Sequence, residues 1–356
     1  PEQQETLGSL KMPGQIAAKF YVNGAYPAVN ADNQPLTLWN DSVQFVDAKG
    51  WLSVAAVDAQ EAYGAKIENF LLLMTVRKGR LDTLDLDKKG ADRFAKPFDI
   101  NGGKGDLNSI AVNLGNPQLP VSIGRNQRLL KDVQINKVMA ANVGKLAGVL
   151  FEETEEASGL VDLTVVECNN VPIADLTSGS KRAKAEFLLS VRDLRLDGVA
   201  PQQLAKLLGL GSQGIIGNIN NAKLSLDGGI ARQDLTLSVL KEVEEEDPRT
   251  GRTKIVEKQE TIDFVGGVDL VSQRFRGYNI NLSQGLVPRT LSKNLKIRDG
   301  LKIPMEGKTS DWLPALTNGL TAGAAKGAIE GTIQDEIEKK GGNVLEDLLN
   351  KNRKRD

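Results

Sequence analysis

The sequence contains no histidine and only one cysteine among its 356 residues. The absence of imidazole removes the commonest general base and metal ligand, and with them Ser-His-Asp and Cys-His catalysis. Cys168 has no partner for an internal disulfide, a CxxC motif or a zinc site. It follows the predicted strand 161–165, so we expect a partly buried thiol near a strand end. The sequence therefore predicts no metal site and no cofactor.

Charge is nearly balanced, with 45 Lys and Arg against 46 Asp and Glu. Proteins that bind nucleic acid normally carry a basic excess, so no nucleic-acid partner is expected. Long hydrophobic runs are also absent. The longest, residues 70–76, has the length of a strand and falls well short of the ~20 apolar residues that span a bilayer.

Two short motifs match the letters of binding sites but lie in the wrong context. Residues 209–214 read GLGSQG, like a dinucleotide fingerprint, but a helical pattern precedes them where a strand is required. Residues 85–90 resemble the start of a calcium loop, but Lys89 takes a ligand position. Because no catalytic cluster emerges, we predict that the protein is not an enzyme and has no catalytic residue.

Short runs that alternate apolar and polar residues fill the second half of the sequence. The run 235–239 reads Leu-Thr-Leu-Ser-Val, and runs 224–226, 267–270 and 278–282 follow the same pattern. Alternation with period two places all apolar side chains on one face of a sheet. That face must be covered by a second protein layer or by something that is not protein.

The pattern along the chain indicates three regions. Residues 1–150 form a mostly β region, residues 151–310 a β-groove or sheet, and residues 311–356 a helical segment. Gly and Asn supply many of the expected turns, and residues 247–251 predict a hairpin turn with charged stems. Within these regions we expect strands at 51–57, 65–77, 79–86, 160–166 and 185–196 and throughout 219–282, and helices at 138–151, 201–208 and 312–340.

The last of these helices has a glycine at every fourth position. Gly319, Gly323, Gly327 and Gly331 lie on nearly the same helix face, which would let another backbone approach closely. Each glycine costs up to about 1 kcal/mol against alanine in an exposed helix, so a packing reason is expected. Packing on the protein's own sheet is the favoured interpretation, and contact with a membrane or partner is the alternative. The predicted fold class is mainly β with α (α+β), with a large curved antiparallel sheet or β-groove, a few short helices and a C-terminal helix.

The order of these features resembles the C-terminal region of AsmA-like proteins, the relatives of AsmA, TamB and YhdP. The resemblance covers residues 100–356 and rests on layout. Its clearest pieces are the Gly-Gly turn at 228–229, the segment LVPRTLSKNLKIRDGLKIPMEGKTSDW at 286–312, and the helix rich in Ala, Gly and Leu that follows. The segment NGGKGDLNSIAVNLGNPQLPVSIGRNQRLLKDVQINKV at 101–138 is similar to planctomycete-type members.

This resemblance implies a long curved β-groove, anchored in the inner membrane by an N-terminal helix, that moves or organises phospholipid between membranes. It places the protein in the periplasm or cell envelope. Membrane contact would come from an anchor missing before Pro1 or from the C-terminal helix. The sequence departs from the family in lacking that anchor and in being too short to bridge a periplasm alone.

Two hypotheses follow for the apolar face. In the first it binds phospholipid or another acyl lipid for outer-membrane biogenesis; in the second it is the dry core of a structural or scaffolding protein of the cell envelope that binds other envelope proteins. A third hypothesis is a partner-binding role for the charged hairpin 241–260. The residues predicted to line the lipid site are Phe187, Leu189, Val191, Leu224, Leu226, Leu235, Leu237, Val239, Val268 and Leu270.

Overall fold

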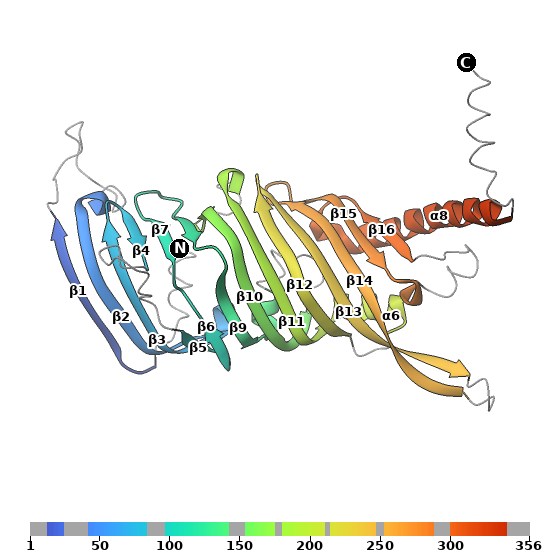
Figure 1. Cartoon of the computed structure of the whole chain (residues 1–356), viewed down its shortest axis with the longest axis horizontal. Helices are drawn as coiled ribbons and strands as arrows, with labels where there is room; N and C mark the ends of the chain where they lie inside the picture. Colours follow the sequence, from blue (N-terminus) through green and yellow to red (C-terminus); the bar gives the residue numbers. More distant parts are fainter. Residues whose placement is uncertain are drawn as a thin grey trace, which may run out of the picture.

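The computed structural model describes residues 13–24, 42–83, 97–141, 154–174, 180–210, 214–246, 253–287 and 300–339. Within these residues, 16 strands form one antiparallel sheet, accompanied by a few short helices and a long C-terminal helix (Figure 1). The predicted fold class is therefore confirmed: the protein is mainly β, with a large antiparallel sheet and helices at its margins.

Most strands pair with their neighbours in the sequence, and the second half, from β10 to β16, is a simple meander. The strands are β1 (Ile16–Gly24), β2 (Val46–Ala59), β3 (Ala65–Arg77), β4 (Arg80–Asp82), β5 (Phe98–Ile100), β6 (Gly103–Gly105), β7 (Ile110–Asn113), β8 (Pro120–Ile123), β9 (Gln127–Gln134), β10 (Thr154–Pro172), β11 (Lys184–Gly198), β12 (Ile215–Asp227), β13 (Ile230–Glu246), β14 (Thr253–Asp269), β15 (Arg274–Leu282) and β16 (Leu301–Met305).

The middle of the sheet divides into two branches. One end of β3 pairs with β4, which leads through β7 to β8, whereas its other end pairs with β5, which leads through β6 to β9. Both branches rejoin at β10, which pairs with β8 and with β9. The one sheet therefore includes strands from both the region predicted for residues 1–150 and the region predicted for residues 151–310.

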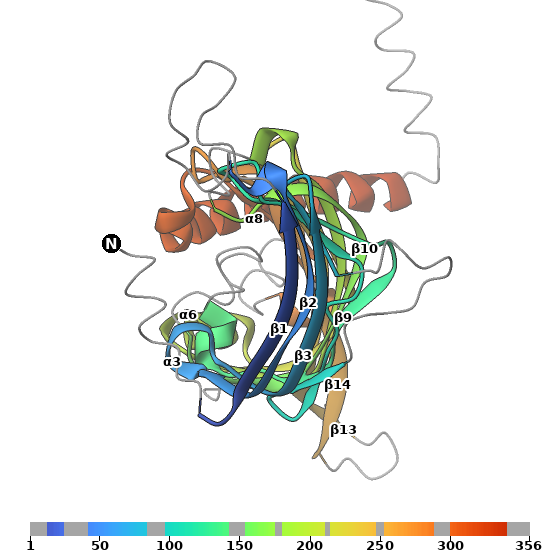
Figure 2. The ribbon, with the colours of Figure 1, turned by 90° about the vertical axis from the view of Figure 1, so that its left-hand side faces the viewer.

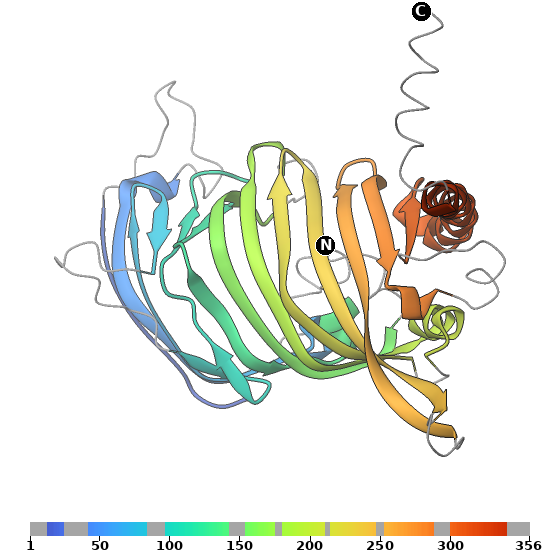
Figure 3. The ribbon, with the colours of Figure 1, turned by 45° about the vertical axis from the view of Figure 1, so that its right-hand side comes forward.

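Sequence patterns located the long strands well. The strand expected at 65–77 is β3, and the expected hairpin is the pair β13 and β14, in register from Ile230↔Asp269 to Glu246↔Thr253. The far end of this hairpin extends from the sheet as a two-stranded ribbon (Figure 3). The turn expected at 247–251 and residues 84–86 of the strand expected at 79–86 lie outside the described residues.

The sheet is curved into a trough, with a crescent-shaped cross-section when viewed along its length (Figure 2). Bulges inside the strands account for this bend, because an extra residue on one strand kinks it and increases its twist. The pairings of β10 with β11, β11 with β12, and β12 with β13 all contain register shifts. The pairings of β9 with β10 and of β14 with β15 contain register shifts as well, and residues with positive φ mark several of these sites: Asp132, Gly159, Asp193, Asn221 and Gly266.

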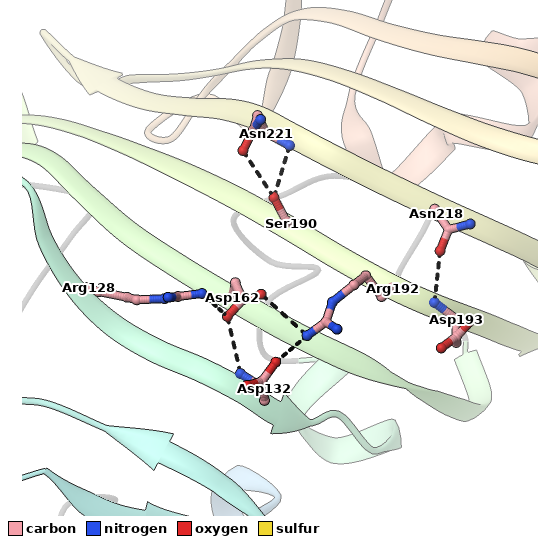
Figure 4. Close-up of polar contacts among 8 residues, drawn as sticks. All are labelled: Arg128, Asp132, Asp162, Ser190, Arg192, Asp193, Asn218 and Asn221. Carbon is pink, nitrogen blue, oxygen red and sulfur yellow. Dashed lines mark hydrogen bonds and ion pairs between the residues drawn. The ribbon is translucent and has the colours of Figure 1, made fainter.

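At the bulges formed by Asp or Asn, a side chain of the neighbouring strand accepts the freed backbone hydrogen bond (Figure 4). The N–H of Asp193 donates to Asn218 Oδ1 at 2.9 Å, and the N–H of Asn221 donates to Ser190 Oγ at 3.0 Å. The N–H of Asp132 donates to Asp162 Oδ1 at 3.1 Å. Each bulge therefore keeps its backbone satisfied while the strand bends.

Two of these bulge residues lie inside predicted strands. Asp193 and Asn221 are within the strands expected at 185–196 and 219–282, in β11 and β12, but their φ is 53° and 50°. Asn and Asp tolerate positive φ better than other side chains, so they suit these bulges. Strand β10 likewise continues through its bulges from Thr154 to Pro172. It is therefore much longer than the strand predicted at 160–166.

Among the described residues, the helices that accompany the sheet include α3 (Gln60–Tyr63), α6 (Val199–Leu208) and α8 (Trp312–Lys339). Helix α6 corresponds to the helix expected at 201–208, and Gly209 ends it with φ of 68°. Residues 137–141 are helical, but residues 142–151 of the helix expected there, and the segment after residue 339, lie outside the described residues. Short 3₁₀ turns occur at Val43–Phe45, Ser180–Arg182, Gln284–Leu286 and Thr309–Asp311.

Helix α8 lies along β16, at the C-terminal edge of the sheet (Figure 3). A Cβ atom at Gly319 would lie 2.0 Å from the carbonyl oxygen of Pro304, and one at Gly323 would lie 2.1 Å from that of Lys302. At these two positions the predicted glycine stripe therefore packs on the protein's own sheet. Trp312, Ala315 and Leu316 bury the adjacent helix face in the main core.

We predict opposite effects for two substitutions at the bulge in β12. Asn221→Gly keeps the positive φ and the hydrogen bond from residue 221 to Ser190, so its free energy of unfolding should stay within about 1 kcal/mol of wild type. Asn221→Val should lose about 1–3 kcal/mol, because a β-branched residue is strained at φ of 50°. Urea denaturation of both variants measures this difference, and equal stabilities would contradict the account of the bulge.

We also predict that Gly319→Ala lowers the melting temperature. Helix propensity alone favours this change by up to about 1 kcal/mol, whereas the added methyl group would meet the Pro304 carbonyl at 2.0 Å. The exposed neighbour Ala322 supplies a control, because Ala322→Gly should cost only the propensity term. A higher melting temperature for Gly319→Ala would show that helix and strand are not in close contact.

Candidate functional site

One face of the sheet is mainly apolar, and it is the concave face. Register pairs Val161, Val191, Ile219 and Leu237 across β10 to β13, so all four share a face. The same core cluster contains Leu204, Ala205 and Leu208 of α6. Because α6 lies inside the trough (Figure 2), these strand residues point into it.

The register places nine of the ten residues predicted for the lipid site on this concave face. They are Phe187, Leu189 and Val191 on β11, Leu224 and Leu226 on β12, Leu235, Leu237 and Val239 on β13, and Val268 on β14. Leu270 is in the turn after β14, where its N–H donates to Gly229 O, and its side chain is 7% exposed.

These residues divide into two groups by exposure. Leu189, Val191, Leu235, Leu237 and Val239 are at most 4% exposed. All five belong to the main core cluster. Val191 and Leu237 are also members of the sealed row, which we define as Val161, Val191, Ile219, Leu237, Ile262, Leu282 and Leu301, paired in register across β10 to β16. Helix α6 and the start of α8 belong to the same cluster. These five residues form an ordinary dry core, so they cannot contact a ligand unless that cluster opens.

The other group, Phe187, Leu224, Leu226 and Val268, is half-buried. Leu226 and Val268 belong to a second registered set that crosses eight strands from β7 to β15. We call this set the half-buried row: Ile110, Ile123, Cys168, Ala185, Leu226, Ala231, Val268 and Phe275. Five of its members are half-buried, and Cys168, Ala185 and Phe275 are buried.

A second row of paired apolar residues lies beside the half-buried row and widens it toward the N-terminal half of the sheet. Val76, Leu81, Val112, Val121 and Val171 pair in register on β3, β4, β7, β8 and β10, and all five are half-buried. The register continues this apolar face from β3 to β1, from Leu72 and Met74 to exposed Phe20. Apolar surface is thus more accessible toward the β1 end than under α6 and α8.

Tyr278, Gln233 and Cys168 place polar atoms on this face. Burial raises the pKa of Tyr278, so its phenol stays protonated and accepts a hydrogen bond from Gln233 Nε2. Burial also raises the pKa of the Cys168 thiol to about 11, and the thiol lies 4.0 Å from Val121 O. At neutral pH the face therefore carries no charge from these groups, and Cys168 is a poor nucleophile.

The convex face is polar, as the alternation predicts. Asp162 accepts hydrogen bonds from Arg128 at 2.7 Å and from the backbone of Asp132, and it lies 3.6 Å from Arg192 (Figure 4). Arg192 also pairs with Asp132. These contacts join β9, β10 and β11 at their bulges, so the cluster has a structural role. In the described part of the chain, no group of three or more His, Cys, Asp or Glu could hold a metal ion.

Comparison with known proteins gives no match to a family model, a curated protein or a solved structure. The resemblance to AsmA-like proteins accordingly stays a prediction. Among the described residues, no helix has the length and apolar character needed to cross a membrane.

Sequence reasoning missed the N-terminal part of this face. It placed the site on β11 to β14, whereas Val76, Leu81, Val112 and Val121 lie on short or branched strands. Strands of three or four residues give too few alternations for their facing side to be identified. The signal that could have indicated them was the Leu-rich run 70–76, which has apolar residues on both faces of β3.

We predict that the two rows differ in their contribution to stability. Leu237→Ala in the sealed row should lower the free energy of unfolding by about 2–5 kcal/mol, because it leaves a cavity in a close-packed core. Leu226→Ala in the half-buried row should cost less than about 2 kcal/mol, since part of that side chain already contacts solvent. Chemical denaturation of both variants tests the difference, and equal losses would mean that both rows are equally sealed.

Proposed function

We propose that the protein binds the acyl chains of phospholipid or another acyl lipid along the half-buried row, and that it does so without catalysing a reaction. The observation that carries this proposal is an uninterrupted apolar ladder across eight strands, of whose members Ile110, Ile123, Leu226, Ala231 and Val268 remain half-buried. Transfer of one methylene group from water to such a surface contributes about 0.8 kcal/mol, so a long acyl chain supplies ample binding energy.

The dimensions of the row suit an acyl chain. Neighbouring strands lie about 4.8 Å apart, so eight strands extend roughly 34 Å along the trough. One leaflet of a bilayer is about half of the ~30 Å hydrocarbon core, and the row is longer than that. A chain lying across the strands would contact one side chain per strand, among them Leu226, Ala231 and Val268.

The chemistry of the row favours a neutral apolar ligand. All of its members are apolar, and the Cys168 thiol is uncharged at neutral pH because its pKa is raised to about 11. The polar side chains of the same strands, such as Lys223 and Ser225, alternate onto the opposite face. Polar headgroups would therefore stay at the rim of the trough, in water.

The sealed row supports a second candidate function, that of a structural protein of the cell envelope. Helix α6 and the first turns of α8 cover the C-terminal half of the concave face, which leaves those leucines and valines as core. We favour lipid binding because this cover does not extend to the cluster around Leu226. Among the described residues that cluster contains only strand residues: Val165, Cys168, Ala185, Ile123, Leu129, Val171, Phe187 and Leu226.

The proposed location is the periplasm or cell envelope, with outer-membrane biogenesis as the process served. This part of the proposal rests on the resemblance to AsmA-like proteins alone. Other envelope proteins would be further partners, and the ribbon of β13 and β14 offers them a charged surface, with Glu242 opposite Glu257.

The test is quantitative mass spectrometry of organic extracts from the purified protein. We expect near-stoichiometric acyl lipid with wild type and at least a tenfold loss, equivalent to about 1.4 kcal/mol, with the double variant Leu226→Asn/Val268→Asn. An amide placed against an acyl chain loses hydrogen bonds to water without gaining others, which costs about 1–3 kcal/mol.

Ser225→Asn provides the matched control, because Ser225 neighbours Leu226 on β12 but points to the convex face. It should retain the lipid. Circular dichroism and melting temperature establish that each variant is folded. Absence of lipid from folded wild-type protein, both as purified and after incubation with phospholipid vesicles, would leave the structural role as the better explanation.

A further inference from the structure

The two edges of the sheet differ in whether another element of the described chain covers them. The C-terminal edge, β16, contains Pro304 and is covered by α8, whose Gly319 lies against the Pro304 carbonyl. The N-terminal edge is β1, and within the described residues it pairs only with β2. All nine residues of β1 are exposed.

Strand β1 also lacks the features that usually protect an edge from pairing with another chain. Its sequence, IAAKFYVNG, has no proline and a single charge, and its register with β2 runs without a shift from Ile16↔Val54 to Gly24↔Val46. Proline, bulges or several charges normally prevent an exposed edge strand from pairing with another chain. Ile16, Phe20, Tyr21 and Val22 are between 46% and 66% exposed.

The hydrogen bonds of β1 to β2 determine which backbone groups face outward. The N–H of Ala55 donates to Gln15 O at 3.1 Å, so residue 15 belongs to a hydrogen-bonded pair. In an antiparallel ladder such pairs alternate, and the odd-numbered residues of β1 therefore use their N–H and C=O toward β2. The even-numbered residues, Ile16, Ala18, Phe20, Val22 and Gly24, direct theirs to the open edge.

These outward groups are complementary to those of a second β1 strand. If two copies meet antiparallel with Phe20 opposite Phe20, then Ala18 faces Val22 and Ile16 faces Gly24 of the other copy. Every pair is made of even-numbered residues, so all outward N–H and C=O groups are used. Lys19 then faces Tyr21 of the other copy, a cation–π pair of the kind that these two residues already form within one chain at 5.1 Å.

Other symmetric registers are less favourable. A shift that centres the pair on Lys19 places two lysines directly opposite each other, which is destabilising, and every shift shortens the overlap. We propose that β1 pairs with β1 of a second copy of this chain, giving a two-fold symmetric dimer with Phe20 at its centre. The axis lies perpendicular to the sheet, so the two concave faces join into one continuous trough. This inference concerns the edge of the sheet and does not depend on lipid binding.

The experiment uses the full chain and sedimentation velocity over a concentration series. Wild type should be a dimer. Phe20→Lys and Phe20→Glu should each weaken the dimer at least tenfold in dissociation constant, because each places like charges opposite each other at the two-fold axis. An equimolar mixture of the two variants should recover a dimer, since opposite charges then meet.

Asn23→Lys is the matched control. It also adds one charge to β1, but residue 23 faces Ala17 of the other copy and not itself, so the dimer should persist. A monomeric wild type would overturn the proposal, and so would a dimer unaffected by Phe20→Lys. Failure of the mixture to restore the dimer would overturn the proposed register. Recovery on mixing also shows that both variants are folded, so a loss of structure cannot imitate the expected result.

Discussion

The trough depends on one constraint, which is that a strand bends only where its freed backbone groups find new partners. Asp132, Asp193 and Asn221 meet this constraint in successive parts of the sheet, each through a side chain of the adjacent strand. Without those acceptors the bulges would leave unpaired N–H groups, and a flat sheet would be favoured. Curvature is thus encoded by polar residues on the convex face, while the apolar residues decide only which side becomes the inside.

The bend in turn divides the apolar face into regions of different exposure. Deep in the trough, α6 and the start of α8 pack on Leu237 and its partners, and these positions act as core. Toward the other ends of the strands the same pattern continues past the helices, and Leu226 and Val268 stay half-buried. The same alternation therefore stabilises the fold in the part of each strand that lies under the helices, and it leaves an apolar surface for a ligand in the part beyond them.

Sequence alone predicted the parts of the fold that depend on local repetition. Alternation of apolar and polar residues located β3, β11, β13 and β14, because each of these strands contains enough repeats of the pattern to be identified. The same alternation predicted that Phe187, Leu224 and Leu235 share a face. It could not separate Leu237, fully buried, from Leu226, half-buried, since their local patterns are alike. That difference comes from a helix distant in sequence. Nor did it predict that Asn221, within the strand region expected at 219–282, forms a bulge, because alternation of side chains does not reveal a positive φ.

The divided middle of the sheet has a mechanical consequence. Between β3 and β10 the ladder passes mainly through strands of three or four residues, whereas the strands on either side have up to 19. Short ladders open at lower free energy than long ones. We therefore expect the fold to be most compliant in this zone of short strands, where a small change in the angle between strands would alter the width of the trough.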